Sequence, residues 1–109
     1  MDLAPFVGIP YSGNKFCRTF AAQVLAANGI PMPEVDVTAD APEWMRVERP
    51  QPLDVVVFNL AGKPAHVGVC IGRGRFLHVE EGERSRIEHL SSSLWCSRIE
   101  GFYRYQGAA

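Results

Sequence analysis

The chain has 109 residues, of which 47% are apolar, and a formal net charge of −1. This length predicts one compact domain over residues 1–109, with enough apolar side chains for a core. The near-neutral charge argues against a nucleic-acid partner or an anionic membrane surface. No apolar run reaches the ~18–20 residues of a membrane span.

We expect synthesis in the cytoplasm with free thiols. Residues 1–5 lack the basic start and the long apolar stretch of a secretion signal. Three cysteines are also an odd and small number for a disulfide scaffold. A reducing compartment would keep a nucleophilic thiol available.

The first regular element that the sequence predicts is a helix over residues 16–28, where apolar side chains recur at helical spacing. Asn28 and Gly29 are typical of a helix end, and Pro31 prevents the helix from resuming. Residues 31–52 contain five prolines. We expect a long loop there, with room for one short helical turn and with Trp44 and Met45 as an apolar anchor.

After the loop, runs of apolar and β-branched residues alternate with glycine-containing turns, a pattern typical of strands. The expected strands are 53–60, 65–71, 75–80, 85–89 and 101–105. A helix followed by consecutive strands predicts an α+β fold, in which the helix packs on an antiparallel β-meander.

The sequence around Gly74 predicts the register of one hairpin. A three-residue loop, residues 72–74, with Gly74 in the left-handed conformation would pair Ile71 with Arg75. His66 and His78 would then share one face as diagonal neighbours, roughly 5–8 Å apart between their β-carbons. A four-residue loop would place them on opposite faces. The three-residue loop is favoured because it sorts the apolar residues onto the other face: Val67, Val69, Ile71, Leu77 and Val79.

Cys17 at the start of the predicted helix and the two histidines together point to thiol chemistry. A helix N-terminus and a neighbouring imidazole both favour the nucleophilic thiolate. His66 would take and return the proton, and His78 would hold His66 in one tautomer. The hydroxyl of Tyr11 and the amide of Cys17 would stabilise the oxyanion.

Each of these residues also has a plainer interpretation. Cys17 alone would usually be a small core side chain, and His66 alone a hydrogen-bonded sheet histidine. A zinc site that adds Cys70 to Cys17 and the two histidines is a weaker alternative, because no paired-cysteine spacing supports it; we predict no metal or cofactor. Three other residues are expected to be structural or solvated: Cys70 and Cys96 protected in apolar surroundings, and His89 in solvent.

Several motifs resemble those of one family. Pro10-Tyr11 resembles a Pro-Tyr entry to a nucleophile loop, and Cys17 the cysteine that opens the next helix. Residues 51–58 resemble "QPGDLVLF", and residues 66–78 resemble "HVGIYLGNGRFIH". Residues 94–104 resemble a closing "W..R..G.YR" stretch. Over nearly its whole length the chain resembles the NlpC/P-sixty superfamily of papain-like cell-wall cysteine peptidases, particularly the compact forms found in phage tail assembly proteins.

The resemblance implies a papain-like minimal fold and a cysteine peptidase or amidase that hydrolyses amide bonds of peptidoglycan stem peptides. It assigns the triad to Cys17, His66 and His78. It also implies phage tail or secretion-machine proteins as partners, which would deliver the chain to the periplasm or cell wall. A non-catalytic tail or interaction module with the same fold is the alternative. Related permuted acyltransferases place the histidine before the cysteine, and this chain does not.

The chain departs from the family pattern at four places. Phe16 and Arg18 flank Cys17 where an acid and a hydroxyl residue are usual, and Leu53 replaces a glycine. The loop between Tyr11 and Cys17 is also short. If Arg18 faces the cleft, it would favour a substrate that carries a carboxylate. If it points to solvent from the first helical turn, it has no such role, and the sequence leaves both readings open.

Overall fold

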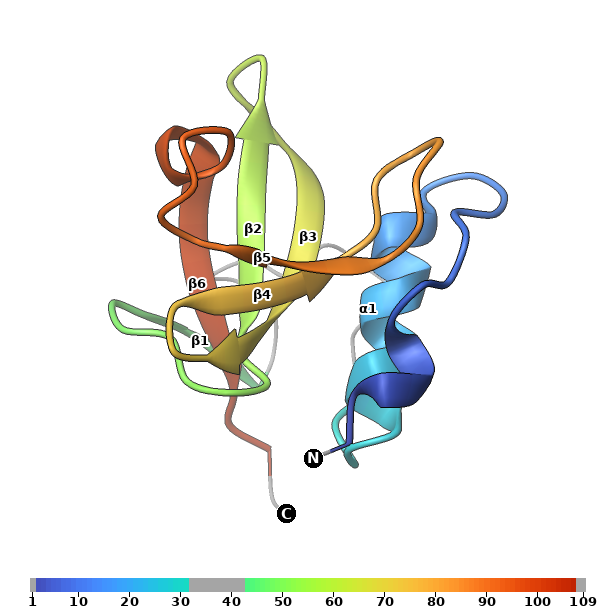
Figure 1. Ribbon diagram of the computed structural model, residues 1–109. Helices are drawn as coiled ribbons and strands as arrows, with labels where there is room; N and C mark the ends of the chain where they lie inside the picture. The colour runs from blue at the N-terminus through green and yellow to red at the C-terminus, as the bar shows by residue number, and fades with distance from the viewer. Residues whose placement is uncertain (1, 32–42, 108–109) are drawn as a thin grey trace.

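The computed structural model describes residues 2–31 and 43–107. In these segments one α-helix packs on a six-stranded antiparallel sheet (Figure 1), which confirms the α+β prediction. No helix in these two segments is long and apolar enough to span a membrane. The elements are η1 (Ala4–Phe6), α1 (Phe16–Ala26), β1 (Trp44–Val47), β2 (Val55–Leu60), β3 (Lys63–Gly72), β4 (Arg75–His78), β5 (Arg86–His89), η2 (Cys96–Arg98) and β6 (Ile99–Tyr105).

Helix α1 begins at Phe16, directly after Lys15 in the left-handed conformation with φ 55°. It ends at Ala26, two residues before the predicted end. The chain then tightens, because the Asn28 amide bonds to the Leu25 carbonyl three residues back. The buried stripe of α1 consists of Phe20, Ala21, Val24 and Leu25, which follows the helical spacing seen in the sequence.

The sheet has the strand order β1-β6-β2-β3-β4-β5. The predicted meander therefore covers β2 to β5, whereas β6 returns to the other side of β2 and pairs with β1. The loop prediction is wrong for residues 44–47, which form β1. Trp44 is buried there against Tyr105, with ring centroids 5.7 Å apart. Positions 32–42 of the predicted loop lie outside the described residues.

The β3–β4 hairpin has the predicted register but a different turn. Val69 faces Leu77, as a three-residue loop requires. Near the turn, however, Gly72 pairs with Arg75 instead of Ile71. The turn itself has only two residues, both left-handed, with Gly74 at φ 70° as predicted. A bulge before Gly72 absorbs the extra residue, so the side chains beyond it keep their faces.

The two faces of the sheet carry different side chains. The helix face packs against α1 and contains Val55, Val57, Val69, Ile71, Leu77 and Val79. The histidine face carries His66 and His78 beside a second apolar cluster of Val56, Phe58, Cys70, Phe76, Leu90 and Trp95. Figure 1 shows β4 and β5 running across the direction of β2 and β3.

Gly68 allows the close packing between β3 and β4 on the histidine face. A β-carbon at this position would lie 2.9 Å from a ring carbon of Phe76 and 3.3 Å from the β-carbon of His78. Real β-carbons essentially never approach another atom to within 3.0 Å, and a contact of 3.3 Å is also tight. Any larger residue at position 68 would therefore push β4 and its histidine away from β3.

A buried ion pair holds the start of β2. The carboxylate of Asp54 is 2% exposed and accepts two hydrogen bonds from Arg104, at 3.0 and 2.8 Å. It also accepts the backbone N–H of Gln51 at 2.7 Å. The preceding residue, Leu53, has φ 74°. This left-handed conformation favours glycine, which is the residue at this position in the motif "QPGDLVLF" that the sequence resembles.

Candidate active site

A cavity of about 270 Å³ contains both Cys17 and His66 in its lining. Cys17 enters from the first turn of α1, whereas His66 comes from β3 and the histidine face. The structure thus brings together, at one cavity, a thiol and an imidazole that are 49 positions apart in the chain. The other lining residues are Tyr11, Phe58, Asn59, Leu60, Ala65, Glu80, Glu81, Trp95 and Arg98.

The segment before Cys17 is bound to the loop between β4 and β5. The N–H of Tyr11 donates to the carbonyl of Glu83 at 3.0 Å, and the N–H of Ser85 donates to Ile9 at 2.7 Å. The hydroxyl of Ser85 donates to the carbonyl of Phe6 at 2.5 Å. These bonds fix the thiol-bearing segment to the same loop that connects the strands of His78 and Glu88.

The hydroxyl of Tyr11 lies at the N-terminus of α1. It accepts the backbone N–H of Phe16 at 3.0 Å, and the two rings meet edge to face at 5.6 Å. The short loop therefore does bring this hydroxyl next to Cys17. Because the oxygen accepts from the helix, its own proton remains available for donation into the cavity that both residues line.

The two histidines contact each other directly. Nε2 of His66 lies 2.8 Å from Nδ1 of His78, which confirms the predicted placement on one face. His78 is fully buried, with 1% of its surface exposed. Since Nε2 of His66 is engaged in this contact, Nδ1 is the ring nitrogen left for the thiol.

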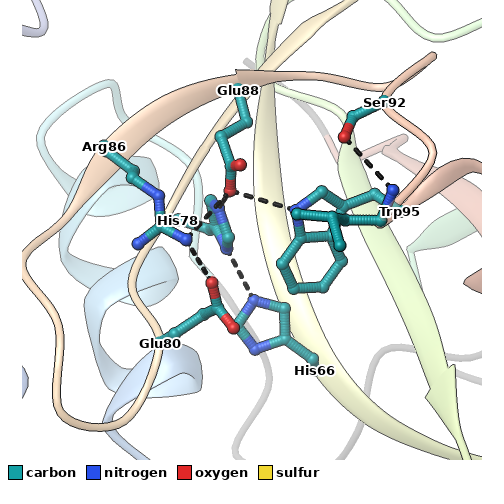
Figure 2. Close-up of polar contacts among 8 residues, drawn as sticks. His66, His78, Glu80, Arg86, Glu88, Ser92 and Trp95 are labelled. Carbon is teal, nitrogen blue, oxygen red and sulfur yellow. Dashed lines mark hydrogen bonds and ion pairs between the residues drawn. The ribbon is translucent and has the colours of Figure 1, made fainter.

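Glu88, which the sequence did not indicate as a site residue, contacts His78 from β5 (Figure 2). Nε2 of His78 is hydrogen-bonded to Oε2 of Glu88, and the indole N–H of Trp95 donates to the same oxygen at 3.0 Å. The indole ring also stacks on His66, with centroids 5.2 Å apart and an interplanar angle of 24°. In the structure His78 pairs with Arg86 and Phe76 with Glu88, so Glu88 shares the histidine face.

Burial keeps both imidazoles neutral at neutral pH. It lowers the pKa of His66 to about 4, with the neighbouring His78 adding to the shift. It also lowers the pKa of His78 to about 4, and Arg86 contributes in the same direction. A neutral His66 has a free lone pair on one nitrogen, so it is able to accept a proton from a thiol.

Glu80, Arg86 and Glu88 surround the buried end of the histidine pair. Arg86 pairs with the carboxylate of Glu80 and lies 3.3 Å from that of Glu88. Ligand atoms of His78, Glu80 and Glu88 all lie within 4.8 Å of one another, a spacing that a metal ion would also use. The guanidinium of Arg86 already supplies positive charge to both carboxylates, so the cluster has its own cation.

The structure places some of the remaining residues as predicted and others differently. Arg18, predicted to bind the substrate, is not among the described residues that line the cavity, whereas Arg98 is. Cys70 is buried in the apolar cluster, where desolvation raises its thiol pKa to about 12. Cys96, predicted to be protected, is exposed at the start of η2, because that turn lies outside the apolar cluster of its neighbour Trp95. His89 is exposed on β5, as predicted.

Comparison with known proteins decides the family. The family model of NlpC/P60, the family written NlpC/P-sixty above, matches residues 10–104. The chain belongs to the NlpC/P60 family. It is 28% identical over 89 residues to a probable endopeptidase p60 of Listeria seeligeri, an alignment that covers 81% of the chain. It is 35% identical over 57 residues, 50% of the chain, to the gamma-DL-glutamyl hydrolase of Bacillus subtilis.

The fold of this NlpC/P60 domain agrees with a solved relative. The NlpC/p60 domain of the peptidoglycan hydrolase SagA superposes with a TM-score of 0.66 at 20% identity, covering 92% of this chain and 90% of that one. The matches to the two curated relatives span only 17% and 14% of their lengths. The similarity to them therefore concerns one domain of much longer proteins.

Proposed function

We propose that this NlpC/P60 domain is a cysteine peptidase or amidase that hydrolyses amide bonds of peptidoglycan stem peptides. The observation that carries the proposal is the cavity lined by both Cys17 and His66, behind which His66 is hydrogen-bonded to His78. The chain order Cys, His, His and the helix-start position of the thiol support the same roles.

In the proposed reaction, Sγ of Cys17 attacks the amide carbonyl carbon while Nδ1 of His66 accepts the thiol proton. The carbonyl oxygen becomes an oxyanion, which accepts hydrogen bonds from the Tyr11 hydroxyl and the Cys17 amide. His66 then protonates the departing amine as the carbon–nitrogen bond breaks. A water molecule, deprotonated by His66, releases the carboxylic acid product and the free thiol.

Two features of the neutral His66 support this order of events. With a pKa of about 4, its imidazole is neutral at neutral pH and has a lone pair that can accept the thiol proton. The short hydrogen bond to His78 leaves only Nδ1 for that task. His78 would thus orient the base, and its loss should cost less activity than the loss of His66.

The proposed substrate rests on the relatives and on the family motifs. One solved relative is a peptidoglycan hydrolase, and one curated relative is a probable endopeptidase. The resemblance to compact phage tail forms leads us to propose delivery of the cytoplasmically made chain to the periplasm or cell wall by a phage tail or related injection device. Arg18 as a selector of substrate carboxylates also stays a proposal, tested by the cleavage preference of Arg18→Ser.

Digestion of purified muropeptides, with products identified by mass spectrometry, tests the proposed function. Wild-type protein should release one amide-cleaved fragment, and Cys17→Ala should abolish that release. Cys96→Ala is the matched control, because it removes the exposed thiol that does not line the cavity, and it should cleave like wild type. A folded wild-type protein that cleaves no muropeptide would favour the non-catalytic module instead.

A further inference from the structure

The carboxylate of Glu88 ends the chain of hydrogen bonds that starts at His66. Oε2 of Glu88 faces three nitrogen groups: Nε2 of His78, the indole N–H of Trp95 at 3.0 Å, and the guanidinium of Arg86 at 3.3 Å. An ionised carboxylate has no proton to give and only accepts. At this end of the hydrogen-bond chain, the direction from donor to acceptor is therefore fixed.

The acceptor at Glu88 also fixes which atoms donate and accept at His78 and His66. Because Glu88 accepts, Nε2 of His78 must carry the proton, and a neutral His78 then presents an unprotonated Nδ1. This Nδ1 accepts from Nε2 of His66, 2.8 Å away. A neutral His66 with its proton on Nε2 has its lone pair on Nδ1, the nitrogen that the proposed reaction uses as a base.

We propose that Glu88 is a positioning residue that sets the tautomer of His66 through His78. Its catalytic consequence rests on the proposed function. Glu88 does not line the cavity, so it acts on the reaction through the residues that it holds, His78 and Trp95. The Glu88 side chain is largely buried, with 19% of it exposed. Burying a carboxylate costs free energy unless it is well paired, and this cost argues that Glu88 has a role at the site.

Trp95 ties the two ends of this chain together. Its N–H holds the carboxylate of Glu88, while its ring stacks on His66. Trp95 thus restrains both Glu88, which accepts the hydrogen bond from His78, and His66, whose tautomer depends on that bond. Arg98 lies over the same ring, 5.6 Å from its centroid, and lines the cavity.

Other charged groups near the imidazoles do not set this direction. Glu80 is paired with Arg86, and the hydrogen bonds described for the two imidazoles do not include it. Arg86 has donors only, so it cannot accept from either histidine. Cys17 and Arg98 lie on the cavity side, at the opposite end of the chain. Of the described groups whose hydrogen bonds reach the imidazole pair, Glu88 is thus the acceptor at the buried end.

The test compares Glu88→Met with Glu88→Gln. Both side chains match glutamate in length, but only glutamine retains an oxygen acceptor. Long-range ¹⁵N–¹H NMR spectra at pH 7 should report a protonated Nε2 on His66 in wild type and in Glu88→Gln. In Glu88→Met, the Nδ1-protonated form should become populated, and kcat on muropeptides should fall about 10- to 100-fold, against about threefold or less in Glu88→Gln.

Glu48→Gln, an exposed site after β1, controls for the loss of one negative charge and should match wild type. A wild-type spectrum with the proton on Nδ1 of His66 overturns the inference without any variant, even if Glu88→Met does not fold. An unchanged tautomer in folded Glu88→Met also overturns it. If the spectra follow the expectation but wild type cleaves no muropeptide, the proposed function fails and the positioning role stands.

Discussion

Mild acid should destabilise this domain through its two buried histidines. In the folded chain, burial holds the pKa of both His66 and His78 at about 4, against 6.5 for an unperturbed imidazole. Between these values the unfolded chain binds more protons than the folded chain. The contribution of the two neutral histidines to the free energy of unfolding is therefore fully present above pH 6.5 and is lost as the pH falls toward 4.

The size of the effect follows from the two pKa values. At pH 5, one such histidine lowers the free energy of unfolding by about 2 kcal/mol. His78 already disfavours protonation of His66, so the two do not add fully, and we expect a total loss of about 2–4 kcal/mol. For a domain with a total stability of roughly 5–15 kcal/mol, this is a large fraction.

Urea unfolding at pH 7, 6 and 5, followed by circular dichroism, measures this loss. An m-value of roughly 1–2 kcal/mol per M converts 2 kcal/mol into a midpoint shift of about 1–2 M urea. The double variant His66→Phe/His78→Phe should lose most of the pH dependence, whereas His89→Gln, on the exposed side of β5, should keep it. An unchanged wild-type midpoint from pH 7 to pH 5 would refute the reasoning.

Three further predictions concern single positions. Arg104→Ala should lower the free energy of unfolding by about 2–4 kcal/mol, because it leaves the buried carboxylate of Asp54 unpaired; urea titration measures this, and a loss below 0.5 kcal/mol would contradict it. Ala61→Asn should raise stability by about 0.5–1 kcal/mol in the same titration, since Ala61 has φ 53° in the two-residue turn before β3; a destabilised variant would argue against this. Brief alkylation with mass mapping should label Cys17 and spare Cys70 until the chain unfolds, since Cys70 is 1% exposed; early label on Cys70 would show that its cluster opens.

The hairpin was predictable because its pattern is strictly periodic. Alternation over residues 65–80 sorts the aliphatic side chains to one face only in the register that also joins His66 and His78; they are Val67, Val69, Ile71, Leu77 and Val79. The bulge before Gly72 was not predictable, since a two-residue turn plus a bulge and a three-residue loop preserve the same faces. The sequence therefore predicts which side chains meet, although it does not predict the turn that joins them.

Strand β1 and Glu88 were missed for a common reason. Trp44–Val47 is short and follows a proline-rich stretch, and its strand conformation depends on pairing with β6, far along the chain. Glu88 lies among charged residues of β5 and looks like part of a solvated face. Only the position of β5 beside β4 turns that face toward His78. Both features are set by tertiary pairing, which local patterns do not encode.

The thiol and the imidazole chain belong to opposite sides of the sheet and meet only at the cavity. Cys17 moves with α1, which rests on the apolar residues of the helix face, whereas His66, His78 and Glu88 are linked to one another on the histidine face. A small shift of the helix would change the gap between sulfur and nitrogen and leave the histidine hydrogen bonds intact. Repacking substitutions under α1, such as Val69→Ala, thus offer a way to adjust the reacting distance from inside the core, without touching any group that takes part in the chemistry.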